Sequence, residues 1–129
     1  MEEERDFYRV VEEICVMDKR YRSDSYEFLM HALYYTQRKL DKKGHIGGRE
    51  LLEGIREFII EQYGPLAKAV LNHWGIFKTD DFGNIVFNLI GKKILSKTDT
   101  DSLSDFKDLY NFDEAFSNIL QNSLTKDNG

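Results

Sequence analysis

Cysteine and proline are scarce in this chain of 129 residues, and each occurs only once. The single cysteine, Cys15, cannot form an internal disulfide and belongs to no Cys-x-x-Cys or metal-ligand spacing. No apolar run approaches the roughly 18 residues that a membrane-spanning helix needs. The first residues, Met1 to Glu4, are acidic, unlike the basic start of a secretory signal. We therefore expect a cytoplasmic protein without a membrane segment.

An excess of basic residues is also missing, since the formal net charge is −5. The imbalance lies at the carboxyl end, where residues 99–129 carry two basic and seven acidic side chains. An acidic surface repels phosphate backbones, whereas nucleic-acid binding usually begins from a basic stripe. The charge therefore disfavours a nucleic-acid partner.

Hydrophobic periodicity predicts a mainly α fold, a single compact domain of about six helices over residues 1–120 followed by a polar tail at residues 121–129. Residues 94–110 form either a short β-hairpin or a short helix, because so short a run does not distinguish the two periods. The apolar stripes recur in six segments: residues 3–18, 24–40, 49–63, 65–74, 80–95 and a last one from Phe112.

Residues with known preferences for helix ends set the expected boundaries. Asp24, with Glu27 three residues later, predicts a capping box at the start of the second helix. Gly75 predicts the exit from the helix over residues 65–74, with Ile76 folding back on its last turn. Thr79 predicts the cap of the next helix, so that residues 65–95 read as a helix-turn-helix-like pair.

The helix over residues 80–95 is apolar around most of its circumference, which predicts a position in the centre of the domain. Only Asn84, Asn88 and Gly91 form a strip without large apolar groups, and Phe87 lies to one side of it. We interpret Asn84, Asn88, Gly91 and Phe87 as a candidate interface. Gly83 and Gly91 each weaken a helix by about 1 kcal/mol relative to alanine, so we expect close approach of another backbone at both.

A glycine-rich turn leads into the helix over residues 49–63. Free amides at a helix amino terminus bind phosphate or carboxylate groups, although neither common phosphate-binding fingerprint is present and a plain capped turn is the alternative. A basic cluster precedes this turn, and cations at the carboxyl end of a helix are also favoured by the helix dipole. The candidate anion-binding residues are Gly47, Gly48, Arg49, Arg38, Lys42 and Lys43.

The histidines give little sign of catalysis or metal binding. His31 has no second ligand at i+3 or i+4, so we expect a satisfied core or edge histidine. His73, with Asp80 and Asp81 downstream, comes nearest to a catalytic combination, but two acids after a cap are also typical of a helix start. We therefore expect no metal site and no cofactor.

Several segments together resemble an uncharacterised group of small bacterial proteins. The resemblance extends from about Phe7 to Phe116 and implies a domain boundary. The group has no assigned activity, so the resemblance implies no catalytic residue. Its motifs include Glu50-Leu51-Leu52-Glu53-Gly54-Ile55-Arg56, Gly64-Pro65-Leu66-Ala67, Trp74-Gly75-Ile76, Asp81-Phe82-Gly83-Asn84-Ile85-Val86-Phe87-Asn88-Leu89-Ile90 and Tyr110-Asn111-Phe112-Asp113-Glu114-Ala115-Phe116.

Three functions follow as hypotheses. The first is a non-catalytic protein-interaction module that binds a protein partner or itself, in which the basic clusters at residues 19–22 and 38–43 meet the acidic carboxyl segment within or between chains. The second is a winged-helix-like nucleic-acid binder, with residues 95–110 as the wing. The third is an enzyme that uses carboxylates with His45 or His73, for which the sequence offers residue types but no geometry.

Overall fold

The fold is seen in a computed structural model that describes residues 2–96 and 103–116, with side chains from Asp6 to Ser96 and from Ser104 to Phe116. In chain order the helices and the 3-10 helices (η) are α1 (Glu2–Met17), α2 (Ser23–Lys39), α3 (Gly48–Tyr63), η1 (Gly64–Leu66), α4 (Ala67–His73), α5 (Thr79–Gly91), η2 (Leu103–Phe106) and α6 (Phe112–Phe116).

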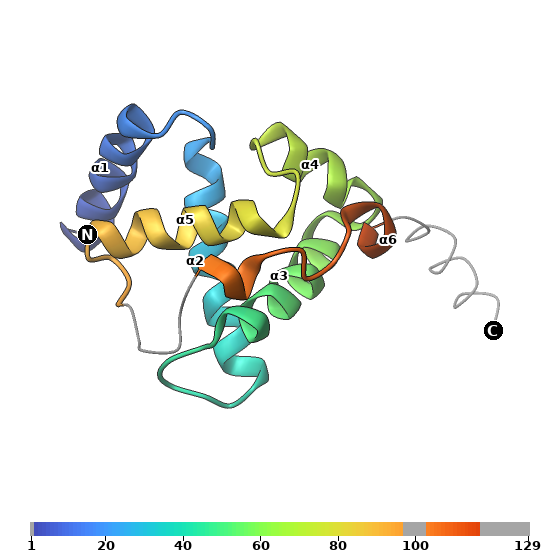
Figure 1. Ribbon diagram of the computed structural model, residues 1–129. Helices are drawn as coiled ribbons and strands as arrows, with labels where there is room; N and C mark the ends of the chain where they lie inside the picture. Colours follow the sequence, from blue (N-terminus) through green and yellow to red (C-terminus); the bar gives the residue numbers. More distant parts are fainter. Residues whose placement is uncertain (1, 97–102, 117–129) are drawn as a thin grey trace.

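The prediction of a mainly α fold is confirmed, and the described segments contain no strand. Part of the predicted hairpin region, Leu103–Phe106, forms a 3-10 helix instead, and Phe106 is buried. The helical alternative therefore holds for this part, while residues 97–102 and the tail at 121–129 lie outside the described residues. Figure 1 shows α5 crossing the middle of the molecule, with α1 near one end and α4 near the other.

The predicted capping box at Asp24 is wrong. Helix α2 begins at Ser23, its cap residue is Arg22, and no side chain makes a capping hydrogen bond there. The side chain of Ser25 instead donates to the Arg22 carbonyl at 2.7 Å. Asp24 thus lies in the first turn, where its charge still suits the helix dipole, and its carboxylate is not tied to the helix end.

Gly75 ends α4 as predicted, with a φ of +91°. The amide of Ile76 donates to the Leu71 carbonyl at 2.9 Å, and Ile76 is fully buried, so the chain folds back on the last turn of α4. The predicted helix over residues 65–74 is divided, because Pro65 lies in η1 and the α-helix begins at Ala67.

Helix α5 is central, as predicted, but differs at both ends. Thr79 does not cap it: the Thr79 side chain is buried and donates to the Phe106 carbonyl at 2.6 Å. The amides of Phe77 and Lys78 are satisfied by Asp81 instead, at 2.8 and 3.2 Å. The helix ends at Gly91 rather than near residue 95, because Lys93 takes a positive φ of 63° and leaves the helical path.

A close neighbour is present at Gly83, but the prediction of a backbone there is wrong, because a Cβ at Gly83 would lie 2.9 Å from the side-chain Cβ of Phe106. The same prediction is wrong at Gly91, where a Cβ would meet no atom within 4 Å. Close packing occurs instead at Gly54, where α3 crosses α2 against Thr36. One hydrophobic core joins these helices, with Phe106, Phe112 and Phe116 closing it from the carboxyl side.

Candidate functional site

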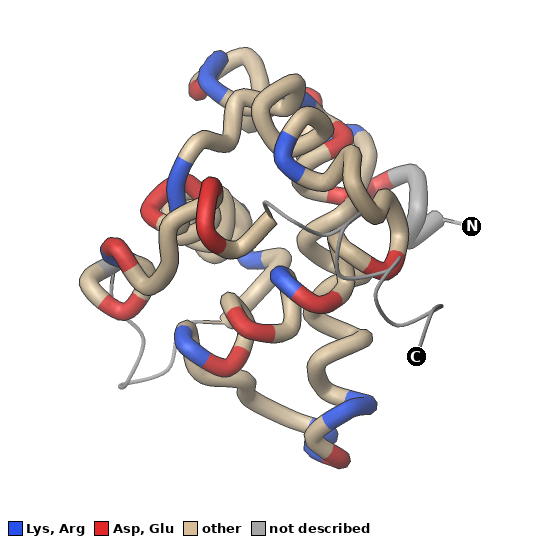
Figure 2. Tube along the Cα trace, turned by 90° about the vertical axis from the view of Figure 1, so that its right-hand side faces the viewer, with Lys and Arg blue, Asp and Glu red and all other residues tan. Residues whose placement is uncertain are grey.

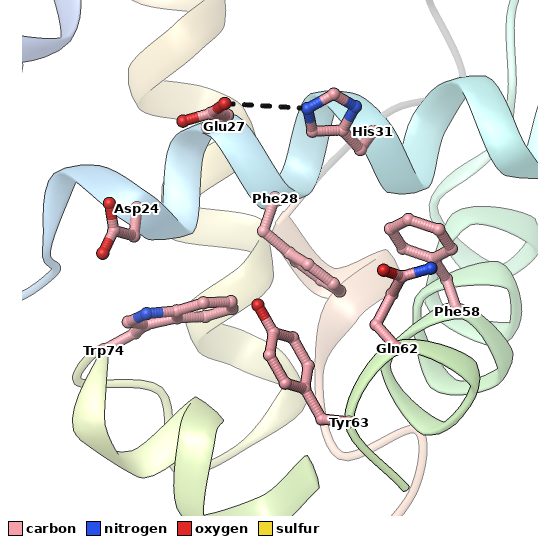
Figure 3. Close-up of a pocket in the computed structure, with 8 residues that line it drawn as sticks. All are labelled: Asp24, Glu27, Phe28, His31, Phe58, Gln62, Tyr63 and Trp74. Atoms are coloured by element: carbon pink, nitrogen blue, oxygen red, sulfur yellow. Dashed lines mark ion pairs between the residues drawn. The ribbon is translucent and has the colours of Figure 1, made fainter.

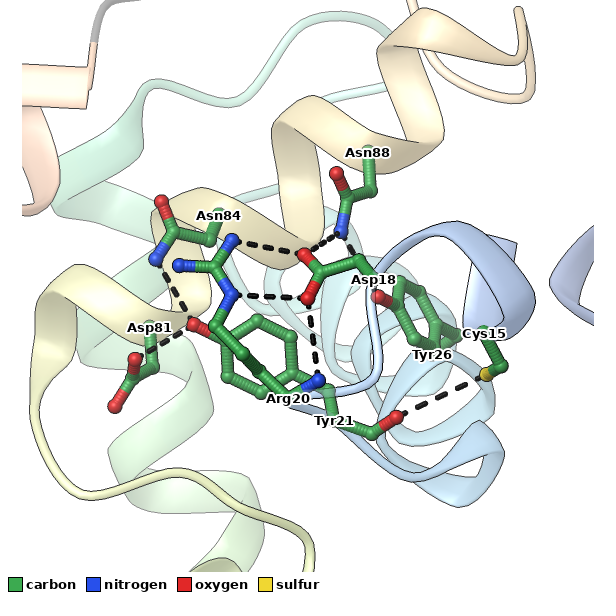
Figure 4. Close-up of polar contacts among 8 residues, drawn as sticks. All are labelled: Cys15, Asp18, Arg20, Tyr21, Tyr26, Asp81, Asn84 and Asn88. Carbon is green, nitrogen blue, oxygen red and sulfur yellow. Dashed lines mark hydrogen bonds and ion pairs between the residues drawn. The ribbon is translucent and has the colours of Figure 1, made fainter. Parts of the chain in front are cut away.

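The two asparagines of the predicted interface face the loop between α1 and α2 (Figure 4). Asn84 Nδ2 donates to the Tyr21 hydroxyl at 2.9 Å. Asn88 Nδ2 donates to Asp18 Oδ2 at 2.9 Å and to the Tyr26 hydroxyl at 3.0 Å. Both side-chain amides are therefore engaged within the chain, and they hold α5 to the end of α1.

Two carboxylates complete this network. Asp18 accepts from Arg20 Nε at 2.9 Å and from Arg20 Nη2 at 2.8 Å, which is a bidentate pair. Asp81 Oδ1 accepts from the Tyr21 hydroxyl at 2.6 Å, while its other oxygen satisfies the start of α5. The network thus connects α1, the following loop and two turns of α5.

The ionisation of these groups fits a structural role. Hydrogen bonds from Arg20, and then from Asn88, hold the pKa of Asp18 well below its usual range. Burial raises the pKa of Tyr26 to about 12, so its hydroxyl stays protonated at neutral pH. Burial also raises the pKa of the Cys15 thiol, which donates to the Tyr21 carbonyl at 3.8 Å. A protonated thiol is a poor nucleophile, in agreement with the absence of reactive-site spacing in the sequence.

The lowered pKa of Asp18 predicts a loss of stability in acid. A carboxylate whose folded pKa lies below its unfolded value stabilises the fold above that unfolded value, and this contribution is lost as the pH falls. We expect the free energy of unfolding to decrease from about pH 5 to about pH 3 in the wild type, and to decrease less in Asp18→Asn. Urea unfolding at several pH values measures both slopes. The exposed Asp6→Asn is the control, and equal slopes for wild type and Asp18→Asn would contradict the prediction.

The remaining two residues of the predicted interface line a groove between α1 and α5. Its volume is about 250 Å³, and Phe87 and Gly91 form its α5 wall together with Asn88. The opposite wall comes from Ile14 and Met17 of α1. The structure therefore brings the predicted residues together beside apolar side chains of α1. The sequence did not identify α1 as the neighbour of this face.

The predicted anion site at the start of α3 is already occupied by acidic side chains. Glu50 Oε1 accepts from the Gly47 amide at 3.0 Å. Gly48 is buried, and a Cβ there would lie 2.9 Å from the Cβ of Asp105. The Arg49 side chain is exposed. The Glu50 carboxylate stands where a bound anion would place its charge, and Asp105 packs against Gly48, so the geometry favours the plain capped turn.

The residues of the basic cluster differ in their contacts. Lys42 forms an ion pair with Glu50 at 2.7 Å, and the neighbouring Lys39 pairs with Glu57, so α3 supplies the opposite charges. Arg38 and Lys43 are exposed. Figure 2 shows a mostly basic end at the turn between α2 and α3, and interspersed charges elsewhere. Within the described chain, the hypothesised pairing of this cluster with the acidic carboxyl segment is therefore not seen; Asp113 of that segment pairs with Lys68 of α4.

The residues considered for catalysis have structural contacts. Asp81 belongs to the Tyr21 network, and Asp80 accepts from the Asp108 amide at 3.1 Å. His73 is exposed, and its carbonyl accepts from Arg22 Nε at 3.0 Å. The described residues contain no group of three or more metal-ligating side chains. Asp80 and Asp81 therefore belong to the start of α5, which is the alternative to catalysis that the sequence offered for them.

The nucleic-acid hypothesis gains no support from this arrangement. Asn84 and Asn88, the base-reading candidates on α5, are engaged with Tyr21, Tyr26 and Asp18. The other large side chains of α5 are mostly buried, so the helix cannot enter a DNA groove without leaving the core.

A cavity lies between α2, the end of α3 and the end of α4 (Figure 3). Its volume is about 400 Å³. Figure 3 shows Phe28, Tyr63 and Trp74 converging below α2, with Asp24 beside Trp74. His31, expected to be a satisfied histidine, is on the rim, where its side chain is 62% exposed and pairs with Glu27 at 3.8 Å. The complete lining is Asp24, Glu27, Phe28, His31, Phe58, Gln62, Tyr63 and Trp74.

Sequence reasoning missed this pocket. Its residues come from three helices, and each had a sufficient local explanation: Phe28, Phe58 and Trp74 as core, Asp24 as a cap. The aromatic content of 13% was the only signal, and it does not say which rings meet.

The comparisons with known proteins add no family. No protein-family model, curated protein or solved structure matches the chain. Within the described segments, no helix has the length and apolar character needed to cross a membrane. The fold and the contacts above therefore define a mainly helical domain, and its function has to be argued from its own surfaces.

Proposed function

We propose that this protein is a non-catalytic cytoplasmic interaction domain that binds a second copy of itself through the groove between α1 and α5. The observation that carries the proposal is the apolar surface beside that groove. Met17, which lines the groove, is 78% exposed and the preceding Val16 is 73% exposed, whereas Val11 and Ile14 of the same helix are buried. Exposed apolar side chains that are neighbours mark an interaction site more often than isolated ones do.

A second copy suits this surface because one face carries both a projection and a recess. Met17 projects at the edge of the groove that Phe87 and Gly91 line. In a two-fold dimer the same patch is used by both subunits, so the projection of each copy can fill the recess of the other. Methionine adapts its shape to an irregular pocket, so the Met17 side chain suits such a recess.

Gly91→Leu tests the proposal with little risk to the fold. A Cβ at Gly91 meets no atom within 4 Å, so the leucine fits the monomer while it fills the groove. We expect the wild type to show concentration-dependent dimerisation by size exclusion with light scattering, and Gly91→Leu to dimerise at least about tenfold more weakly.

Gly44→Leu is the matched control, because a Cβ at Gly44 also meets no atom within 4 Å and Gly44 lies in the turn between α2 and α3. It should dimerise like the wild type. A wild type that stays monomeric up to millimolar concentration, or equal weakening by both leucines, would reject the proposal.

A further inference from the structure

The pocket between α2, α3 and α4 combines aromatic rings with acidic groups, and His31 on its rim is its one basic residue. Four of its eight lining residues are aromatic, two are carboxylates, and none is lysine or arginine. It shares no lining residue with the groove between α1 and α5, so it is independent of the proposed self-association. At about 400 Å³ it has room for a small organic group.

Three of the aromatic rings that line the pocket pack against one another at steep angles. The centroids of Phe28 and Trp74 are 5.2 Å apart with planes at 46°. Tyr63 meets Trp74 nearly at a right angle, at 82° and 6.0 Å. Phe28 and Trp74 are largely buried and Tyr63 is 39% exposed, so Tyr63 contributes the most accessible ring surface. Aromatic faces carry partial negative charge, so the ring surfaces that reach the pocket attract a positively charged group.

The two carboxylates of the pocket, Asp24 and Glu27, add negative charge, and the protein provides few positive partners for them. Among the described residues, none donates a hydrogen bond to the Asp24 carboxylate or forms an ion pair with it. Glu27 accepts from the Tyr8 hydroxyl at 3.2 Å and lies 3.8 Å from His31 Nε2, so its carboxylate has no lysine or arginine partner among the described residues. The nearest arginine in the sequence, Arg22, is held at the His73 carbonyl and does not line the pocket.

We infer that this pocket binds an organic cation, the ammonium or guanidinium head of a ligand, through the faces of Trp74, Phe28 and Tyr63 and the charges of Asp24 and Glu27. The aromatic walls favour a large, weakly hydrated cation over a small metal ion, because ring faces offer no lone pairs to replace bound water. The same head group occurs on free quaternary amines and on lysine and arginine side chains of proteins.

Trp74 is the only tryptophan in the chain, so its fluorescence reports on the pocket directly. The probes are choline, the blocked amino acids N-acetyl-lysine methylamide and N-acetyl-arginine methylamide, and 3,3-dimethylbutanol, which has the shape of choline without its charge. We expect saturable fluorescence changes and calorimetric binding with at least one cation, and no binding of the neutral analogue.

Asp24→Asn with Glu27→Gln should weaken cation binding about tenfold. Tyr63→Leu, which keeps apolar bulk but removes a ring face, should weaken it about fivefold. Asp41→Asn with Glu53→Gln removes the same charge from exposed positions outside the pocket and should leave the affinity unchanged.

The relative affinities identify the source of the ligand. Tighter binding of choline supports a free amine, and tighter binding of a blocked lysine or arginine supports a side chain of a partner protein. Equal binding of choline and 3,3-dimethylbutanol, unchanged affinity in the Asp24 and Glu27 double variant, or no binding of any cation overturns the inference.

Discussion

Replacing Gly75 with alanine is expected to lower the free energy of unfolding by about 4 kcal/mol, a large part of the stability of a domain of this size. Gly75 has a φ of +91°, a conformation that residues with a Cβ rarely adopt. An alanine Cβ there would also overlap the carbonyl oxygen of Arg20 and lie 3.2 Å from its carbonyl carbon. A side chain could rotate away, but here two segments of backbone would have to separate.

That separation would also disturb the neighbouring contacts. The Arg22 amide donates to the Trp74 carbonyl at 3.1 Å, and Arg20 belongs to the network with Asp18. Urea unfolding followed by circular dichroism measures the effect without relying on the adjacent tryptophan. Gly91→Ala is the control and should be neutral or slightly stabilising, because it has free space and a helical backbone. An unchanged unfolding midpoint in Gly75→Ala would show that the two turns are not packed as described.

Gly54→Ala should lower the free energy of unfolding by about 3 kcal/mol, because it overpacks the crossing of α2 and α3. An alanine Cβ would overlap Thr36 Oγ1 and lie 2.8 Å from Thr36 Cβ. Thr36 is 2% exposed, and its hydroxyl donates to the Ala32 carbonyl at 2.7 Å, so it has little freedom to move. The contact between α2 and α3 is the most extensive in the fold.

A double-mutant cycle separates this clash from a general loss of helix stability. Thr36→Ala removes the hydroxyl and methyl that meet the new Cβ, so adding it to Gly54→Ala should recover at least about 1 kcal/mol. Thermal or urea unfolding of the four proteins gives the coupling energy. Strictly additive effects would contradict a direct contact between the two positions.

Several local features of the fold were predictable from the sequence. The apolar stripe of α1, the left-handed exit at Gly75 and the burial of α5 depend on residues a few positions apart, and the structure confirms each. The errors at Asp24 and Thr79 are also instructive. Both residue types cap helices well, but Thr79 bonds instead to Phe106, 27 positions away, and a contact of that kind has no local signal.

The candidate surfaces were predictable only in part. Periodicity identified Asn84, Asn88, Gly91 and Phe87 as one face of α5, because a regular helix determines which of its residues share a face. It did not show that two of them bind the loop after α1 while the other two line a groove. The difference depends on where α1 lies, which no repeat along α5 encodes.

The sequence by itself determined the class of fold, the main helical faces and the turn at Gly75, because these follow from the spacing of apolar side chains and the freedom of glycine over short stretches. The tertiary structure decided how the polar and aromatic residues are used. Asn88 meets Asp18 across 70 positions, and Phe28 of α2 meets Trp74, which follows the end of α4. Such neighbours are chosen by the packing of the whole core, so the groove and the aromatic pocket exist only in the folded chain.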